Sequence, residues 1–465
     1  MEPTTTSDPA PAHAGDQSRE QWSSKIGFVL AAAGSAIGLG NIWRFPYVTG
    51  ENGGAAFVIV YLACIAFICL PYLLAELALG RRSQKNPVGA IKAVTGRTPW
   101  MLVGGLGILT GLFILSYYGV IAGWTFGYIF KNVVSPDTAF ADFIATPGLV
   151  LPLFALFLGS TAAIVQGGVE DGIERAAKVL MPILLVLMLL VIVRGVTLEG
   201  ASAGLSFYLN PDFSKIGSGA IVAALGQAFF SLSLGMGAMV TYGSYLPEKE
   251  NLLSAGGYVA LFDTGIALLA GLMIFPAVFA LDGNPQAGPT LVFDVLPGLF
   301  QQMPLGTSVG MLFFLLLSVA ALTSTVSLME VVVSYCMDER HWSRSKSVAV
   351  VTGGAFAFGF PAALSQGISP TLTDMTWLVG ESGVLGATDF LGIMDTIWGN
   401  ISLALGALLL CVFAGWVWGV ADAAAEIRSG AGAFAPGAAQ VWGMFIKYVC
   451  PLVILVVLLD AFQVI

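Results

Sequence analysis

Long apolar runs recur along almost the whole chain. Each is long enough to cross a lipid bilayer as a helix. They lie near residues 25–47, 54–79, 101–130, 148–166, 173–197, 219–245, 255–281, 306–337, 345–361, 390–421 and 440–463. The pattern predicts an all-α polytopic membrane protein with eleven transmembrane helices. A polar tail, residues 1–18, precedes the first run, and its Pro, Thr and Ser content predicts a disordered cytoplasmic tail.

Two of the runs carry glycine and polar residues at their centres. The first reads AAAGSAIGLGNIWRFPY and the sixth contains GQAFFSLSLGMGAMVTYGSY. Glycine weakens a membrane helix at a depth where no water replaces its internal hydrogen bonds. A single glycine there is more typical of close helix packing. Because Asn41 and Arg44 accompany the glycines of the first run, we favour an opened helix whose freed carbonyl oxygens suit a hard cation such as sodium.

The two interrupted runs begin successive blocks of five segments. Five is an odd number, so the second block enters the membrane from the opposite side, which is the arrangement of an inverted repeat. We therefore predict one transmembrane transporter domain over residues 19–465, with repeats near 19–197 and 219–421 and an extra helix at 440–463. A binding site is expected near the membrane midplane, where the two broken helices meet.

Composition and charge exclude several classes of protein. With 57% hydrophobic and 10% charged residues, the chain is not an ordinary soluble protein. Its net charge of −9 argues against a nucleic-acid partner. The two histidines, His13 and His341, lie outside the apolar runs, and no nucleophile elbow, Walker loop or metal-ligand spacing is present. We therefore predict that the protein is not an enzyme.

The Lys and Arg residues of the loops predict the orientation. Most of them fall on the side of the amino terminus if segments alternate across the bilayer. Positive loops remain on the cytoplasmic side. We expect a multi-pass protein of the plasma (inner) membrane, with a cytoplasmic amino terminus and, after eleven segments, an external carboxyl terminus.

Acidic residues inside the apolar runs need partners. An intramembrane acid is expensive to insert, and amides freed at a helix break would satisfy Glu76. Asp263 lies several residues inside the seventh run, which favours a functional role over a structural ion pair. Asp395 lies near the outer end of the tenth run and is a candidate partner for Arg44.

Hydroxyl groups mark two further helices. Ile114 and Tyr118 lie one turn apart on the third segment, where a tyrosine hydroxyl needs a hydrogen-bond partner. In the eighth segment, ALTSTVSLME places Thr323 and Ser324 on one face with Leu328. Such hydroxyls more often bond to carbonyls of their own helix, so this motif alone is a weak signal.

Three motifs together resemble those of the neurotransmitter:sodium symporter family. They are REQWSSKIGFVLAAAGSAIGLGNIWRFPYVTGENGG, GQAFFSLSLGMGAMVTYGSY and ALTSTVSLMEV, and the resemblance runs from Arg19 to about Val464. It is most specific for prokaryotic amino-acid transporters, which have the leucine-transporter fold. The resemblance implies two sodium ions. One, shared with the substrate, would be held by Ala36, Asn41, Ser231 and Asp263, and the second by Gly34, Ile37, Ala320, Thr323 and Ser324.

The resemblance also implies a substrate pocket and two gates. In the family's arrangement Tyr118 binds the substrate carboxylate and Phe230 closes over the ligand. The pocket would comprise Ser35, Ala36, Gly38, Gly40, Ile114, Tyr118, Phe230, Ser231, Ser233, Met236, Ser324 and Leu328. Arg44 and Asp395 would form the outer gate, and Arg19, Trp22, Ser244, Tyr245 and Asp338 the inner gate.

The chain departs from the family's pattern in three ways. It has Asp263 where many relatives have a neutral amide and Ala267 where chloride-dependent ones have a hydroxyl, so we expect Asp263 to supply the negative charge that chloride supplies elsewhere. It has Gly38 where monoamine carriers have an acid, which favours a substrate with its own carboxylate. It has eleven segments instead of the common twelve, which favours a monomer or a weak dimer.

The expected function is therefore sodium-coupled uptake of hydrophobic L-amino acids, aromatic ones among them, by alternating access. Met236 and Leu328 would line the side-chain end with apolar groups that adapt to different shapes. Two alternatives remain: a proton-coupled amino-acid carrier of the same fold, and a nontransporting amino-acid sensor. The residues Asn41, Thr323 and Ser324 argue for sodium, and the lack of a sizeable soluble domain argues against a sensor.

Overall fold

The computed structural model describes residues 19–96, 98–135, 138–288, 290–430 and 434–462. The predicted disordered tail, residues 1–18, lies outside this part of the chain. Every named element in the described part is a helix, and its only pairing of the β type is an isolated bridge between Val384 and Ala387. The predicted all-α class is confirmed.

Nine helices of the described part are long and apolar enough to cross a membrane. They are α3–η2–α4 (Ala55–Ser83), α6 (Met101–Val134), α8 (Pro147–Gln166), η3–α9 (Gly168–Val196), α13 (Leu252–Ala280), α15 (Gly306–Arg340), α16 (Arg344–Leu364), α19–η6–α20–η7–α21 (Phe390–Arg428) and α22–η8–α23 (Pro436–Ala461). A tenth is the bent pair of α1 (Lys25–Ala36) and η1–α2 (Gly40–Glu51), whose halves meet at 52°. With α11 (Ser218–Ser231) and α12 (Ala238–Gly243), these match the eleven predicted segments.

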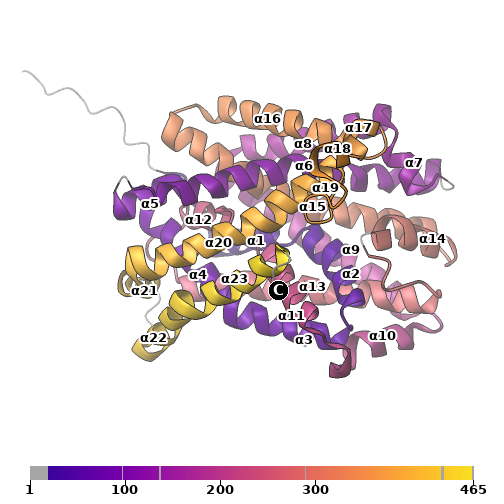
Figure 1. Ribbon diagram of the computed structural model, residues 1–465, viewed down its shortest axis with the longest axis horizontal. Coiled ribbons are helices and arrows are strands. Elements are labelled where there is room, and N and C mark those ends of the chain that lie inside the picture. Colours follow the sequence, from indigo (N-terminus) through magenta and orange to yellow (C-terminus); the bar gives the residue numbers. More distant parts are fainter. Residues whose placement is uncertain (1–18, 97, 136–137, 289, 431–433, 463–465) are drawn as a thin grey trace, which may run out of the picture.

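Short helices lie at the two ends of the bundle (Figure 1). One end carries α5 (Pro87–Thr95), α12, α21 (Val420–Arg428) and the start of α22 (Pro436–Met444). The opposite end carries α7 (Phe140–Ile144), α10 (Ala201–Leu209), α14 (Leu296–Gln301), α17 (Pro370–Thr373) and α18 (Thr376–Val379). We call these the inner and outer ends, after the orientation predicted from the loops.

The first helix breaks directly after Ala36. Ile37 is extended, with φ −74° and ψ 105°, and the chain becomes helical again at Gly40. The hydroxyl oxygen of Tyr118 accepts a 2.9 Å hydrogen bond from the Leu39 amide, and the Asn41 side-chain oxygen accepts a 3.1 Å bond from the Gly38 amide. Side chains thus satisfy amides that an unbroken helix would have paired internally.

The sixth segment breaks between Ser231 and Ala238. The connecting residues include Ser233, Gly235 and Gly237, all with positive φ. Gly235 is required here because a Cβ atom would lie 2.4 Å from the carbonyl oxygen of Leu403. The Gly235 amide donates to the carboxylate of Glu76 at 3.1 Å. The prediction that a freed amide would satisfy Glu76 is confirmed.

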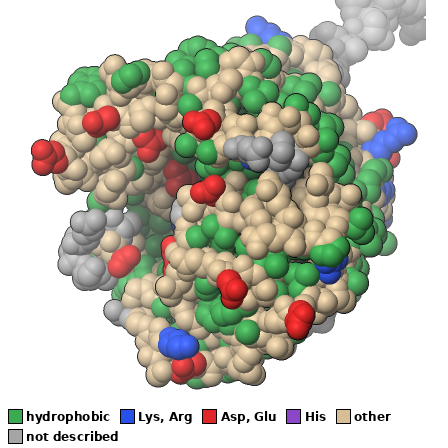
Figure 2. Space-filling view, turned by 90° about the vertical axis from the view of Figure 1, so that its right-hand side faces the viewer, with side chains coloured by type: hydrophobic (Ala, Val, Ile, Leu, Met, Phe, Trp, Pro, Cys, Tyr) green, Lys and Arg blue, Asp and Glu red, His purple; other side chains and the backbone are tan. Residues whose placement is uncertain are grey.

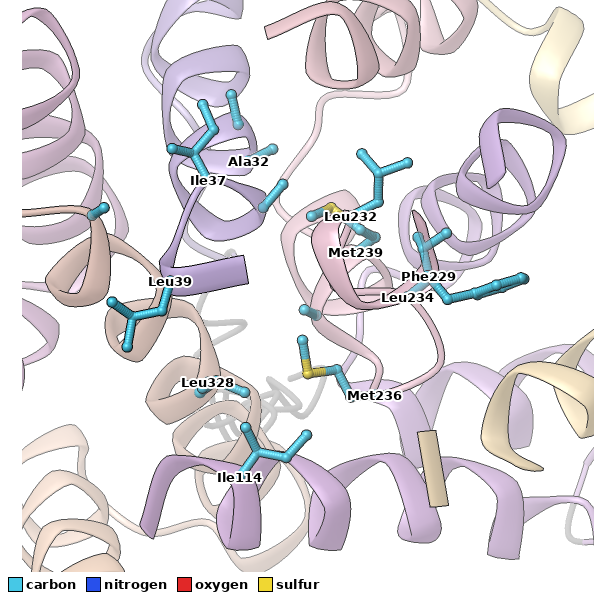
Figure 3. Close-up of a cluster of buried hydrophobic side chains, with 14 of the residues drawn as sticks. Ala32, Ile37, Leu39, Ile114, Phe229, Leu232, Leu234, Met236, Met239 and Leu328 are labelled. Carbon is cyan, nitrogen blue, oxygen red and sulfur yellow. The ribbon is translucent and has the colours of Figure 1, made fainter. Parts of the chain in front are cut away.

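Two long continuous helices support the breaks. α6 and α15 pack against each other along much of their lengths, and α1 also contacts α15. Figure 3 shows Ile114 of α6 and Leu328 of α15 facing Met236 and the residues between the two broken halves. The fold therefore places two interrupted helices beside two intact ones.

Candidate binding site at the helix breaks

A small cavity of about 30 Å³ lies between the two breaks. The two broken segments and two intact helices line it. The lining residues are Ala36, Gly38 and Gly40 of the first segment, Phe230, Ser233 and Met236 of the sixth, Ile114 and Tyr118 of α6, and Ser324 and Leu328 of α15. All ten were predicted from the sequence as pocket residues. Ser35 of the predicted set adjoins the cavity through hydrogen bonds to Ser233 and Ser324. Ser231 lies beside the lining residue Gly40, where a Cβ atom would be 3.8 Å from Cα of Ser231. Leu403 of α20 (Leu403–Val412) also lines it, and sequence reasoning missed it because no polar group or glycine marks it.

The cavity has a polar end and an apolar end. Carbonyl oxygens and hydroxyl groups of the first and eighth segments surround one end: Ser324 Oγ lies 3.2 Å from the Ser35 carbonyl oxygen, which also accepts from Ser233 Oγ at 3.1 Å. The side chains of Ile114, Met236 and Leu328 form the other end. This arrangement suits a ligand that is charged at one end and hydrophobic at the other.

Oxygen atoms of the first and eighth segments converge beside the cavity. The Ile37 carbonyl oxygen lies 3.3 Å from Ser324 Oγ and 3.4 Å from Thr323 Oγ1. Thr323 Oγ1 also donates to the carbonyl oxygen of Ala320 at 2.9 Å. A Cβ atom on Gly34 would lie 3.3 Å from Cβ of Thr323, so Gly34 belongs to the same cluster. Carbonyl and hydroxyl oxygens are ligands of hard cations.

A second cluster surrounds the carboxylate of Asp263, which is fully buried in α13. Asn41 Nδ2 donates to Asp263 Oδ1 at 2.7 Å and to Ser231 Oγ at 2.9 Å. Ser231 Oγ donates to the same carboxylate at 2.9 to 3.0 Å. Three segments, the first, sixth and seventh, therefore meet at one buried carboxylate. In the described part of the chain no ion pair compensates Asp263.

A pair of neutral polar groups borders the Asp263 cluster. Tyr61 donates its hydroxyl hydrogen to Ser231 Oγ at 3.3 Å, and Gln227 Nε2 donates to the Gly40 carbonyl oxygen at 2.8 Å. The side-chain oxygen of Gln227 is buried and has no hydrogen-bond partner. Ala267, one turn after Asp263 on α13, is fully buried.

A larger vestibule opens above the cavity on the outer side. Its volume is about 360 Å³, and Tyr118 and Phe230 line both spaces, so these two side chains separate them. The outer face of the molecule is hollowed and carries more acidic than basic side chains in the view of Figure 2. Arg44 and Asp395, the predicted outer gate, both line the vestibule.

The two outer-gate residues have separate partners. The Arg44 guanidinium lies 4.7 Å from the ring centroid of Phe230, and it donates to Asn400 Oδ1 at 3.4 Å. Asp395 accepts a 2.8 Å hydrogen bond from the Tyr117 hydroxyl. No Arg44–Asp395 ion pair occurs among the salt bridges of the described residues. The outer side is therefore open.

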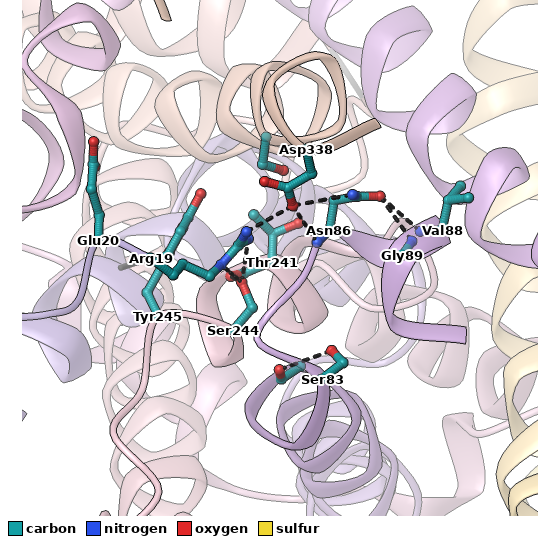
Figure 4. A network of polar contacts seen from close by, with 12 residues as sticks. Arg19, Glu20, Ser83, Asn86, Val88, Gly89, Thr241, Ser244, Tyr245 and Asp338 are labelled. Atoms are coloured by element: carbon teal, nitrogen blue, oxygen red, sulfur yellow. Dashed lines mark hydrogen bonds and ion pairs between the residues drawn. The ribbon is translucent and has the colours of Figure 1, made fainter. Parts of the chain in front are cut away.

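The inner side is closed by a network of polar contacts (Figure 4). Arg19 pairs with Asp338 at 2.7 Å and donates to Ser244 Oγ at 2.7 Å, and its guanidinium lies 4.6 Å from the ring centroid of Tyr245. Trp22 Nε1 donates to the carbonyl oxygen of Tyr242 at 3.0 Å. The structure thus brings all five predicted inner-gate residues together.

Comparison with known proteins agrees with this geometry. A family model described as "Sodium:neurotransmitter symporter family" matches residues 19–147 and 137–465. An uncharacterized sodium-dependent transporter, YhdH, of Bacillus subtilis (strain 168) is 38% identical over 457 residues, covering 96% of this chain and 98% of that protein. The chain belongs to the sodium:neurotransmitter symporter family. It is a sodium-dependent transporter of that family and not an enzyme.

Two further known proteins show how far the likeness extends. An uncharacterized sodium-dependent transporter of Haemophilus influenzae is 35% identical over 467 residues, covering 96% of this chain and 98% of that protein. The crystal structure of MhsT in complex with L-phenylalanine superposes with a TM-score of 0.84 and 44% identity, covering 95% of this chain and all of that chain. The predicted leucine-transporter fold is confirmed.

Sequence reasoning from the symporter family missed a layer of acidic residues behind the inner gate. Glu330 is fully buried in α15, accepts from the Tyr245 hydroxyl at 2.6 Å and pairs with Arg344 at 2.9 Å. Glu174 accepts from the amide and the hydroxyl of Ser23 at 2.8 and 2.6 Å. Since Glu330 lies inside an apolar run, the rule that intramembrane acids need partners would have found it.

We predict that removing the inner ion pair loosens the first turn of α1. The Arg19→Ala variant loses contacts to Asp338 and Ser244, so its backbone amides at residues 25–29 should exchange hydrogen for deuterium about tenfold faster, since a hydrogen bond to a charged group contributes about 1.5–3 kcal/mol. The control is Lys25→Ala, which removes the more exposed 3.5 Å pair with Glu250 from the same turn. Equal exchange rates in the two variants would contradict the gate assignment.

Proposed function

We propose that this protein is a symporter that couples inward sodium movement to uptake of hydrophobic L-amino acids, aromatic ones included, by alternating access. One observation carries the proposal: a cavity with a polar and an apolar end lies between two helix breaks, with an oxygen cluster on each side of its polar end. The closed inner network and the open outer vestibule are what an outward-facing state requires.

The substrate class follows from the two ends of the cavity. A Cβ atom on Gly38 would lie 2.3 Å from Ser324 Oγ, so the position leaves no space for an acid that would hold a bare amine. The Tyr118 hydroxyl and the amides of the first break would bind the carboxylate of an amino acid. Ile114, Met236 and Leu328 would contact its side chain. A solved relative with 44% identity holds L-phenylalanine, which supports an aromatic substrate.

We propose two sodium ions, treated as transported substrates. One would bind to the oxygens of Gly34, Ile37, Ala320, Thr323 and Ser324. The other would bind between the substrate carboxylate and Ala36, Asn41, Ser231 and Asp263. In the structure the amide hydrogens of Asn41 point to Ser231 and Asp263. A half-turn of this amide would direct Oδ1 toward the same place, where a cation replaces the donated hydrogens. This turn would give up the bond that Oδ1 accepts from the Gly38 amide, so the Gly38 amide would need another acceptor, such as the substrate carboxylate.

We propose that chloride is not required. Asp263 supplies a fixed negative charge beside the shared sodium site, and the buried Ala267 provides no hydroxyl to bind an anion. Tyr61 and Gln227 remain as polar neighbours of this position. Uptake by proteoliposomes should therefore be equal in chloride and in gluconate.

Topology and assembly are proposed on the same basis. The inner end, with Arg19, Arg81 and Lys92, would face the cytoplasm of a plasma (inner) membrane, and the carboxyl terminus would lie outside. Residues 19–197 and 219–421 would form the inverted repeats, with α22–α23 as the extra helix. For the assembly we propose a monomer or a weak dimer.

The test is flux of a panel of labelled L-amino acids into proteoliposomes with an inward sodium gradient. We expect the sodium gradient to raise the accumulated amount of hydrophobic and aromatic amino acids about tenfold or more over the amount without sodium. The reason is that about 1.4 kcal/mol of gradient energy corresponds to a tenfold concentration ratio across the membrane. A proton gradient should not replace sodium. Equal uptake with protons alone would favour a proton-coupled carrier, and binding without flux would favour a sensor.

A further inference from the structure

A lysine lies inside the last membrane helix, away from the site between the breaks. Lys447 is in η8 (Phe445–Val449), about 16 Å along the helix axis from Pro436, where α22 begins. An ammonium group at such a position is unfavourable unless other groups compensate its charge. The transport site does not use this residue, since neither the cavity nor the vestibule includes it.

The neighbours of Lys447 are aromatic faces. Its Nζ lies 5.6 Å from the ring centroid of Trp416 and 5.7 Å from that of Tyr448. These two rings stand at 90° to each other with centroids 5.8 Å apart. Ring faces attract a cation. No carboxylate of the described chain forms an ion pair with Lys447, so the rings compensate its charge only in part.

This cluster lies on the lipid-facing surface. Trp416 is 48% and Tyr448 59% exposed, although both belong to membrane-crossing helices. A Cβ atom on Gly415 would lie 3.2 Å from Cα of Lys447 and 3.5 Å from its Cβ and Cγ, so the lysine stem packs against the space that Gly415 leaves between the two helices. Lys447 is half-buried, and its ammonium group emerges beside the exposed rings of Trp416 and Tyr448.

The helix direction determines which leaflet the lysine reaches. Side chains on a helix tilt toward its amino-terminal end. α22 begins at the inner end, beside α21 (Figure 1), so the Lys447 stem leads toward the headgroups of the inner leaflet.

We propose that Lys447, Trp416 and Tyr448 form a binding site for an anionic phospholipid of the inner leaflet. The lipid phosphate would pair with the ammonium group, and its acyl chain would lie against the exposed rings of Trp416 and Tyr448. A phospholipid fits better than a free anion because the Lys447 charge lies within the membrane-crossing part of the helix. A phospholipid presents both a phosphate and hydrocarbon there, whereas a free anion would have to leave water. A net negative headgroup is needed because the cation has no other counter-charge.

The test uses the purified full-length protein in nanodiscs that contain equal amounts of phosphatidylglycerol and phosphatidylcholine with identical acyl chains. Native mass spectrometry after release counts the retained lipids of each kind. We expect about fivefold preferential retention of phosphatidylglycerol, the factor for one basic residue at an anionic surface. Lys447→Gln should abolish the preference. The control is Lys346→Gln, since Lys346 also lies over a tryptophan ring, 4.5 Å from Trp342, but is exposed at the start of α16.

A second variant keeps the proposal testable if Lys447→Gln fails to fold. Trp416→Leu retains the cation and removes one of the two rings, and it should lower the preference at least about twofold. Unchanged preference in both variants would overturn the proposal. Loss of the bound lipid to added inorganic phosphate would show a plain anion site and would also overturn it. A change of oligomeric state in Lys447→Gln, measured by light scattering, would instead make this face a contact between copies of the chain.

Discussion

Asp263→Asn should make uptake dependent on chloride and lower the apparent sodium affinity about 100-fold or more when chloride is absent. A unit negative charge within about 4 Å of a cation contributes about 4 kcal/mol at an effective dielectric constant of about 20, and asparagine removes that charge without changing the side-chain volume. The carboxylate is fully buried and bonded to Asn41 and Ser231, so no solvent ion replaces it freely. The measurement is sodium-dependent uptake of labelled phenylalanine in chloride and in gluconate.

The control for this variant is Asp282→Asn, which removes a carboxylate from an exposed loop at the outer end. A double variant, Asp263→Asn with Ala267→Ser, should recover more uptake in chloride than the single variant, because the added hydroxyl lies one turn away on α13 and provides a donor for the anion. If uptake by the unaltered protein already falls severalfold in gluconate, Asp263 does not take the place of chloride.

Thr323→Ala should weaken sodium binding about 10-fold to 100-fold. The change removes one hydroxyl oxygen from the cluster formed with the Ile37 and Ala320 carbonyls, and a contact to a charged group contributes about 1.5–3 kcal/mol. The measurement is the sodium concentration that gives half-maximal binding of radiolabelled phenylalanine to purified protein.

Thr325→Ala is a matched control on the same helix. Thr325 is buried, donates to the Leu322 carbonyl and contacts Thr161 at 2.8 Å, on the face turned away from the first segment. Its loss should leave the sodium response unchanged. Equal responses of both variants would remove Thr323 from the sodium site and with it the assignment of the second ion.

The helix breaks could be predicted from the sequence because glycine and polar residues seldom gather at the centre of an apolar run unless the helix opens there. A positive φ at Gly235 and the amide of Gly235 bonded to Glu76 are local consequences of that pattern. The pocket residues followed from the same two motifs, from the hydroxyl groups of the third and eighth segments, and from the resemblance to the family. Leu403 was missed because an apolar residue in an apolar helix carries no signal about the direction it faces.

Contacts between distant segments were predicted at the inner gate, where Arg19 pairs with Asp338, but the partners of the outer-gate residues were not. Arg44 and Asp395 were predicted as the outer gate from their charge, their depth and the resemblance to the family. In the structure both line the vestibule, where Arg44 lies over Phe230 and Asp395 accepts from Tyr117. We expect these contacts to change with the conformational state, because a vestibule of about 360 Å³ separates the elements on the outer side. One sequence is compatible with all the conformational states of a transporter, so it does not specify which contacts form in this one.

The short length of α11 has a consequence for biosynthesis. Its 14 residues extend about 21 Å, less than the roughly 30 Å of hydrocarbon that a membrane helix must cross. The segment that follows it is unwound, with polar backbone that lipid cannot solvate. During synthesis this region therefore cannot stay in the bilayer as an isolated helix. We expect α11 to enter together with neighbours such as α3, against which it packs. Substitutions there are expected to reduce the yield of inserted protein as well as its turnover.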